Sequence, residues 1–158
     1  MTTAETVTRD WGDTVRIRAE VQATGGRTFT GFLHLLPFAS IHLGPETPDD
    51  VLNRDEAFFA LTDDQEHTIF LSKAQVILVA VEHSERDPDR TIAARTIGLR
   101  IELSDGSEHS GTVRSELPPT RTRAIDFLNI GTGFFGLYAA DTVRYINRRH
   151  IRAAFPSS

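Results

Sequence analysis

Two short segments pair an aspartate with an asparagine at the same spacing, and both side chains can hydrogen-bond a polar ligand. Asp50 precedes Asn53 by three residues, as Asp126 precedes Asn129. A carboxylate accepts hydrogen bonds, whereas a carboxamide both donates and accepts them. The same residue types also stabilise turns, because an aspartate caps the start of a helical turn and an asparagine can end one in a left-handed conformation. We favour this structural interpretation, since each pair encloses a leucine that we expect to be buried.

A second candidate site is the basic C-terminal segment. Its cationic side chains are Arg144, Arg148, Arg149, His150 and Arg152, with Arg121 and Arg123 before them. Clustered arginines are typical of phosphate-binding surfaces. The alternative, which we favour, is a solvated hairpin whose charge is offset by the acidic first half. Residues 1–83 carry 6 basic and 13 acidic side chains, a net charge of −7, and residues 84–158 carry 11 and 9, a net charge of +2.

Catalytic and metal-binding motifs are absent from the sequence. The six histidines lack the spacing of a zinc site, and there is no cysteine. No nucleophile elbow, phosphate-binding loop or dinucleotide fingerprint occurs. We therefore expect no enzyme, with no catalytic residues, no metal and no cofactor. A ligand carrier or small enzyme would need a pocket that joins distant residues such as His34 and His109.

Composition indicates a folded, water-soluble chain. Of the 158 residues, 39% are hydrophobic and 25% are charged. No apolar run approaches the roughly 20 residues that span a bilayer, and no basic-then-apolar leader opens the sequence. Without cysteine there are no disulfides. These features predict a cytoplasmic protein that does not contact a membrane.

The strongest pattern in the sequence is an internal duplication. Segments 50–61 and 126–137 share the pattern Asp-x-Leu-Asn-x4-Phe-Phe-x-Leu at an offset of 76 residues. The correspondence extends on both sides, from Gly31-Phe32-Leu33 to Gly111-Thr112-Val113 and from Phe70–Val76 to Tyr145–Ile151. Such a pattern means two copies of one supersecondary unit.

Each copy has the pattern of two strands, a loop with a one-turn helix, and three further strands. Alternating polar and apolar residues separated by turn residues predict strands at 14–22, 27–36, 58–61, 67–72, 75–81, 96–103, 108–114, 134–138, 142–146 and 151–155. Five short, bent strands in about 60–70 residues are typical of a small barrel. We therefore predict an all-β fold with little helix, an internal duplication of a five-stranded barrel.

The expected boundaries follow the turn and charge patterns. We expect an N-terminal tail at 1–13, a first β-barrel repeat at 14–82, a linker at 83–94 and a second β-barrel repeat at 95–156. The linker is charged, contains Pro88 and lacks apolar periodicity.

These motifs resemble those of the Sm-like (LSm) family, whose unit is an SH3-type small barrel. The residues that resemble its first motif are Gly31-Phe32-Leu33, Asp50, Asn53 and Leu61, repeated as Gly111-Thr112-Val113, Asp126, Asn129 and Leu137. Phe70–Val76 and Tyr145–Ile151 resemble the second motif, with Lys73-Ala74 and Arg148-Arg149 in place of its Arg-Gly pair. The tandem pattern is also similar to bacterial domains of unknown function. The resemblance implies an Sm/SH3-like fold and, as one function, RNA binding through Asn53, Asn129, Arg148 and Arg149.

The two Phe-Phe pairs predict a contact surface outside the core of each half. Neighbouring strand residues point to opposite faces of a sheet. One residue of Phe58-Phe59 and one of Phe134-Phe135 must therefore cover a second surface. That surface is either an interface between the two halves or an oligomer contact. Stacking of bases or of an apolar ligand is the alternative that we favour less.

The loop Pro37–Pro48 is a candidate partner-binding segment. It carries Phe38, Ile41 and Leu43 between prolines, and its counterpart in the second copy is shorter and polar. Exposed apolar loops suit a protein partner or self-association. The alternative is a lid that folds back over the end of a barrel.

Together these features predict a non-enzymatic scaffold or protein-interaction module built from two Sm-like repeats, which self-associates. Phe38, Ile41 and Leu43 are its predicted partner-binding residues. The alternative is an Sm-like RNA-binding protein that uses Asn53, Asn129, Arg148 and Arg149.

Overall fold

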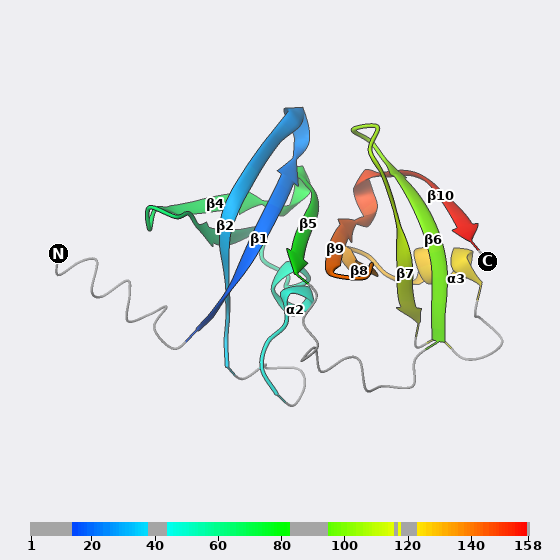
Figure 1. Ribbon diagram of the computed structural model, residues 1–158, viewed down its shortest axis with the longest axis horizontal. Coiled ribbons are helices and arrows are strands. Elements are labelled where there is room, and N and C mark those ends of the chain that lie inside the picture. The colour runs from blue at the N-terminus through cyan, green and yellow to red at the C-terminus, as the bar shows by residue number, and fades with distance from the viewer. Residues whose placement is uncertain (1–13, 38–43, 83–94, 116, 118–122, 158) are drawn as a thin grey trace.

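The computed structural model describes residues 14–37, 44–82, 95–115, 117 and 123–157, and Figure 1 labels its elements. Over these residues, ten antiparallel strands form one sheet with little helix, which confirms the all-β prediction. The expected tail 1–13 and the linker 83–94 lie outside the described residues. None of the described helices is long and apolar enough to cross a membrane.

The two halves of the chain contain the same order of strands and α-helices, and they differ in that only the first has a 3-10 helix between its first two strands. The first has β1 (Val15–Ala23), η1 (Thr24–Gly26), β2 (Arg27–Leu35), α2 (Pro48–Leu52), β3 (Phe58–Thr62), β4 (Thr68–Ser72), η2 (Lys73–Gln75) and β5 (Val76–Glu82). The second has β6 (Arg95–Leu103), β7 (Glu108–Ser115), α3 (Ala124–Ile130), β8 (Phe134–Tyr138), β9 (Thr142–Asn147), η5 (Arg148–His150) and β10 (Ile151–Ser157). Every strand lies within two residues of its predicted bounds.

Neighbouring strands lie in the sheet in the spatial order β10-β6-β7-β8-β9-β5-β1-β2-β3-β4. The two halves therefore meet where β5 pairs with β9, and β4 and β10 are the ends of the sheet (Figure 1). The sheet is not closed, so strand pairing does not form the closed five-stranded barrels that the sequence led us to expect. The strand patterns identified the elements, but they contain no information on whether the end strands meet.

Two apolar cores stabilise the sheet, and each includes side chains from the other half. The first core is built mainly from β1–β5 and α2, but it also contains Phe134, Val143 and Tyr145. The second core is built mainly from β6–β9, but it also contains Ile77 and Leu78 of β5. Because burial of apolar surface is the main driving force of folding, each half depends on the other to complete its core.

A glycine permits the same close backbone approach in each half. β2 and β3 pair only at Phe32 with Thr62, and β7 and β8 pair only at Thr112 with Tyr138. A Cβ atom on Gly31 would overlap the carbonyl oxygen of Thr62. The paired glycine of the sequence pattern, Gly111, stands in the same relation to the carbonyl oxygen of Tyr138.

The fifth strand of each half also has an irregularity at the corresponding place. The pairing of β1 with β5 skips Ile77, because Gln22 pairs with Leu78 and Ala23 with Val76. The pairing of β6 with β10 skips Arg152, 75 residues later. A bulge of this kind bends a strand and increases its twist, so β5 and β10 follow similar paths along their halves.

Replacing Gly111 with alanine should lower the free energy of unfolding by about 1–3 kcal/mol, because the added methyl group overlaps backbone that cannot move without disturbing the β7–β8 crossing. Chemical denaturation followed by circular dichroism measures the change. Ser110→Ala, at the exposed neighbouring position, is the matched control and should change stability by less than about 0.5 kcal/mol. A Gly111→Ala variant as stable as the parent would contradict the close approach.

Candidate functional site

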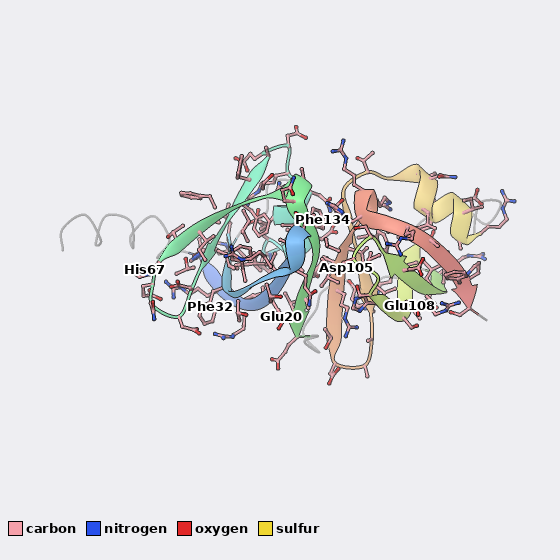
Figure 2. All side chains as sticks on the ribbon, turned by 90° about the horizontal axis from the view of Figure 1, so that it is seen from above. Glu20, Phe32, His67, Asp105, Glu108 and Phe134 are labelled. Carbon is pink, nitrogen blue, oxygen red and sulfur yellow. The ribbon has the colours of Figure 1, made fainter. Side chains whose placement is uncertain are left out.

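The contact between the two halves combines strand pairing, side-chain hydrogen bonds to backbone and shared apolar cores. β5 and β9 pair from Leu78 with Ile146 to Glu82 with Thr142. Phe134, at the start of β8, lies at the centre of the molecule between the two groups of strands (Figure 2). We call this contact, formed by α2 and β5 of the first half with β8, β9 and η5 of the second, the junction.

Asn53 connects the halves through the backbone of Phe134. Its Oδ1 accepts a hydrogen bond of 2.8 Å from the Phe134 N–H, and its Nδ2 donates one of 3.0 Å to the Phe134 carbonyl oxygen. Nδ2 also donates to Asp49 Oδ1 at 3.1 Å. The carboxamide thus pairs with β8 as a neighbouring strand would. Gly133 leaves room for this contact, since a Cβ atom there would overlap Asn53 Oδ1.

The turn around Asn53 differs from the predicted one in two respects. Thr47, not Asp50, is the N-cap of α2, and Asp50 is the third helical residue of a capping box. The Thr47 N–H donates to Asp50 Oδ2 at 2.8 Å, and the Asp50 N–H donates to Thr47 Oγ1 at 3.3 Å. Asn53 has a φ of −104°, so the predicted left-handed conformation is wrong. The reciprocal pair of bonds fixes Asp50 inside the helix.

The second copy of the motif is arranged differently. α3 continues through Asn129, whereas α2 ends before Asn53. Asn129 is exposed in the last turn of α3. Asp126 lies in the first turn and pairs with Arg123, with 3.1 Å between Oδ2 and Nε. The N-cap Arg123 forms no side-chain capping bond, so Asp126 is not the cap that the sequence predicted.

Asn147 and His150 complete the junction. The sequence analysis did not single out Asn147, and it placed His150 only in the basic C-terminal cluster. Asn147 Nδ2 donates to the carbonyl oxygens of Lys73 at 3.1 Å and Val76 at 2.9 Å, and the side chain is buried. His150 Nε2 donates to the Ala74 carbonyl oxygen at 2.9 Å. The available signal was a difference between the two copies of the repeat: Asn147, at the end of a strand, stands where the first copy has Ser72.

A cavity of about 500 Å³ opens between α2 and α3, over β8. Its charged and aromatic lining includes Asp49, Asp50, Arg114, Phe127, Tyr138 and Arg148. The Arg114 guanidinium stacks 3.9 Å from the centre of the Tyr138 ring. No histidine is among the described residues that line the cavity. Charges of both signs therefore face the same space beside aromatic rings.

Arg148 is held within this lining. Its guanidinium lies 5.3 Å from the Phe127 ring centre and 4.9 Å from that of Phe135. The terminal nitrogens are 3.4 Å from the carbonyl oxygens of Thr132 and Phe127, and Nε is buried with no partner among the described residues. Burial lowers the pKa of Arg148 from its ordinary value, and Asp49 opposes that change. Arg148 is thus a packed cation, whereas Arg149 is exposed on η5.

The structure brings some of the predicted RNA-binding residues together. Asn53 and Arg148 line the cavity between α2 and α3, and Asn53 and Arg149 line a neighbouring hollow on η2 and η5. Asn129 is not among the described residues that line either space. Asn53, Asn129 and Arg149 are exposed and Arg148 is half-buried. The Asn53 carboxamide is already bonded to the backbone of Phe134, and Arg148 is packed against aromatic rings.

Phe38, Ile41 and Leu43 lie outside the described residues, but the ends of their loop are fixed. The Leu36 N–H donates to Glu46 Oε1, and the Glu46 N–H donates to the Leu36 carbonyl oxygen, both at 2.9 Å. The buried Glu46 carboxylate also forms an ion pair with Arg54. These contacts, which we call the loop clamp, bring Leu36 and Glu46 together at the surface of the first half.

His34 and His109 do not share a cavity. His34 is buried, with Nε2 2.6 Å from Thr62 Oγ1 and Nδ1 3.3 Å from Thr14 Oγ1. His109 lines a shallow hollow beside Arg144 that His34 does not reach. Within the described part of the chain, no three histidine or acidic side chains are grouped as metal ligands.

No protein-family model matches the sequence, no curated protein is detectably similar to it, and no solved structure matches it. The function is therefore argued from the contacts of the chain itself.

Replacing Asn53 with alanine should lower the free energy of unfolding by about 1–2 kcal/mol, because two hydrogen bonds to Phe134 are lost. Urea denaturation in dilute solution measures the change. Asn129→Ala removes the corresponding side chain from an exposed turn and should change stability by less than about 0.5 kcal/mol. Equal losses in the two variants would show that Asn53 does not stabilise the junction.

Stability should also fall as the pH decreases from about 7 towards 5. Burial, aided by the charge of Arg16, lowers the pKa of His34 from its ordinary value, so the folded protein keeps the ring neutral. The unfolded chain takes up a proton below about pH 6.5, which favours unfolding there. His34→Gln should give a shallower dependence of unfolding free energy on pH across this range, measured by urea denaturation. The slope should not vanish, because burial also lowers the pKa of His109. An unchanged slope would exclude His34 as a contributor.

Proposed function

We propose that this chain is a non-enzymatic scaffold or protein-interaction module, built from two Sm-like repeats, that self-associates. One observation carries the proposal: large apolar side chains are exposed at both ends of the sheet. Phe58 and Phe70, on β3 and β4, are 57% and 72% exposed, and Phe155 on β10 is 40% exposed. Together with the unpaired outer sides of β4 and β10 in the described part of the chain, they form two surfaces suited to protein contact.

An open sheet edge favours contact with another protein chain over contact with a small molecule. The outer backbone N–H and C=O groups of an edge strand can pair with a further strand, and natural proteins usually protect such edges with charges or by covering them. β4 contains no charged residue. Its Phe70 is exposed and its Ile69 is half-buried, whereas Leu71 belongs to the first core. Addition of a strand from another chain is stabilised by backbone hydrogen bonds and by contacts between side chains, and this edge offers groups for both.

The polar groups at the junction support a non-enzymatic role. Asn53 and Asn147 donate to backbone carbonyl oxygens, and Asp50 accepts from the Thr47 N–H in the capping box of α2. A catalytic nucleophile needs a base within hydrogen-bond reach. In the lining of the cavity, as far as it is described, Ser115 has no histidine beside it.

The loop with Phe38, Ile41 and Leu43 is a further segment that we propose for partner binding, in addition to the two ends of the sheet. The loop clamp holds Leu36 and Glu46, on either side of this segment, against each other on the first half of the chain.

RNA binding through Asn53, Asn129, Arg148 and Arg149 is the alternative function. Asn53, Asn129 and Arg149 are exposed, as this function needs. The net charge of −5 opposes binding to a polyanion, and Asn53 and Arg148 already have intramolecular contacts.

Sedimentation equilibrium of the full chain should give an average mass that rises with protein concentration. Phe70→Asp should weaken this association at least tenfold, because a charge at the sheet edge opposes strand pairing. Val15→Asp changes an exposed apolar residue on an interior strand and should leave the association unchanged. A deletion of residues 38–43 tests the loop separately, since association that persists in it does not depend on Phe38, Ile41 or Leu43.

The absorbance ratio at 260 and 280 nm of protein purified at low salt tests the alternative. A monomeric mass at every concentration, together with a raised ratio that high salt abolishes, would replace the scaffold proposal with RNA binding. A monomeric mass without bound nucleic acid would reject the self-association.

A further inference from the structure

We propose that the cavity between α2 and α3 binds a small organic carboxylate with an aromatic body, and that Arg114 holds the carboxylate group. The volume of about 500 Å³ lies within the range of roughly 300–1,000 Å³ that is common for small-molecule sites. This site is independent of the proposed self-association, because Phe58, Phe70 and Phe155 at the ends of the sheet do not line the cavity.

Arg114, on β7, lines the cavity as a cation without an acidic partner. Its guanidinium lies 3.9 Å from the centre of the Tyr138 ring. It forms no hydrogen bond or ion pair with any residue that the structure describes, and its Nη1 is buried without a partner. A guanidinium carries five N–H donors, and buried donors are nearly always satisfied in folded proteins. An acceptor from a ligand would therefore satisfy a group that the described protein leaves unpaired.

Arg148 contributes a second unpaired donor to the same lining. Its Nε is buried with no partner in the described part of the chain. The guanidinium lies over Gly131, where a Cβ atom would be only 2.9 Å from Arg148 Cζ. The rings of Phe127 and Phe135 lie 5.3 and 4.9 Å from it. Aromatic rings thus hold both arginines in place before a ligand arrives, which limits the side-chain entropy that binding would cost.

The charge of the lining favours a carboxylate over a phosphate group. Its charged members, among the described residues, are two arginines and the aspartates Asp49 and Asp50, so it has no formal net charge. A carboxylate adds one negative charge, whereas a phosphate monoester adds nearly two at neutral pH. Asp49 lies close enough to Arg148 to oppose the lowering of its pKa, and it would repel the more highly charged group more strongly. The two oxygens of a carboxylate also match the planar fork of a guanidinium.

The remaining lining suits a ring-containing body. Aromatic side chains from α3, β8 and β9 face the cavity, among them Phe127, Phe134 and Tyr145. Such rings favour stacked or edge-on contact with a further ring. Phe134 lies at the centre of the molecule (Figure 2), and α2 on the opposite wall belongs to the first half. A ligand here would therefore contact both halves and stabilise the junction.

The first half does not repeat this arrangement. His34 stands at the position of Arg114, and Thr62 stands at that of Tyr138. His34 Nε2 lies 2.6 Å from Thr62 Oγ1, so these two polar groups satisfy each other within the protein. The repeat can therefore form the same strand crossing without a cation at this position. The change to an arginine without a bonded acceptor, in one copy alone, favours a role in binding over a role in the fold.

Isothermal titration calorimetry with phenylacetate tests the site. Phenylacetate should bind with a millimolar or lower dissociation constant, and phenylacetamide, its uncharged analogue, should bind about tenfold more weakly. Arg114→Gln should weaken phenylacetate binding by a similar factor. Arg27→Gln is the matched control and should leave binding unchanged, because Arg27 also stacks on a ring, 4.7 Å from the centre of Phe29, but lies outside the cavity. Circular dichroism confirms that both variants fold.

Thermal unfolding gives a second readout of the same site. A ligand that binds only the folded chain raises the midpoint of unfolding. An excess of phenylacetate should raise the midpoint of the parent chain and of Arg27→Gln, and it should leave that of Arg114→Gln nearly unchanged. In two-dimensional NMR spectra, phenylacetate should shift the backbone amide signals of Ser115, Gly136 and Tyr138, which line the cavity.

Four outcomes would overturn the proposal. Equal affinities for phenylacetate and phenylacetamide would show that the charge is not recognised, and equal losses in the two arginine variants would show that Arg114 has no special part. Neither heat of binding nor a change in midpoint at millimolar phenylacetate would show that the cavity does not take this class of ligand. Uridine monophosphate that binds more tightly than phenylacetate, and loses affinity in Arg114→Gln, would assign the cavity to a phosphate ester and favour the RNA-binding alternative.

Discussion

The antiparallel pairing of β5 with β9 is the constraint on which the rest of the structure depends. It places three side chains of the second half, Phe134, Val143 and Tyr145, in the first core. In return, Ile77 and Leu78 of the first half complete the second core. Because burial of apolar surface drives folding, loss of either half would remove buried side chains from the core of the other. The cavity between α2 and α3 exists because the same pairing brings the helices to one side of β8.

The elements were predictable because their signals are local. Alternation of polar and apolar residues located each strand, and the repeated Phe-Phe pairs indicated a surface beyond each core, which Phe134 fills at the junction. The partner of each strand was not predictable, since pairing between β5 and β9 joins segments far apart in the sequence and leaves no mark in either. For the same reason Asn53 was interpreted as a turn residue, although its carboxamide binds the backbone of Phe134.

The two halves have different side-chain contacts at one corresponding position of the repeat, which is His34 in the first half and Arg114 in the second. His34 of β2 is buried against the hydroxyl group of Thr62. At the corresponding place in the second half, the Arg114 guanidinium stacks on the Tyr138 ring. The first arrangement fills the space beneath the strand crossing, whereas the second borders the cavity. The close backbone approach at Gly31 in the first half and at Gly111 in the second is the same. The two halves therefore differ here in their side chains and not in the path of the backbone.

The loop clamp allows the sequence between Leu36 and Glu46 to change independently of the rest of the fold. Leu36 and Glu46 are bonded to each other, and Arg54 neutralises the buried carboxylate. The entropic free-energy cost of closing a loop rises by only about 0.6 kcal/mol for each doubling of the loop length. Once the closing bonds are formed, the intervening residues can lengthen, shorten or change in composition at little energetic cost. Selection can therefore act on this segment, and on whatever it contacts, without altering the sheet that supports it.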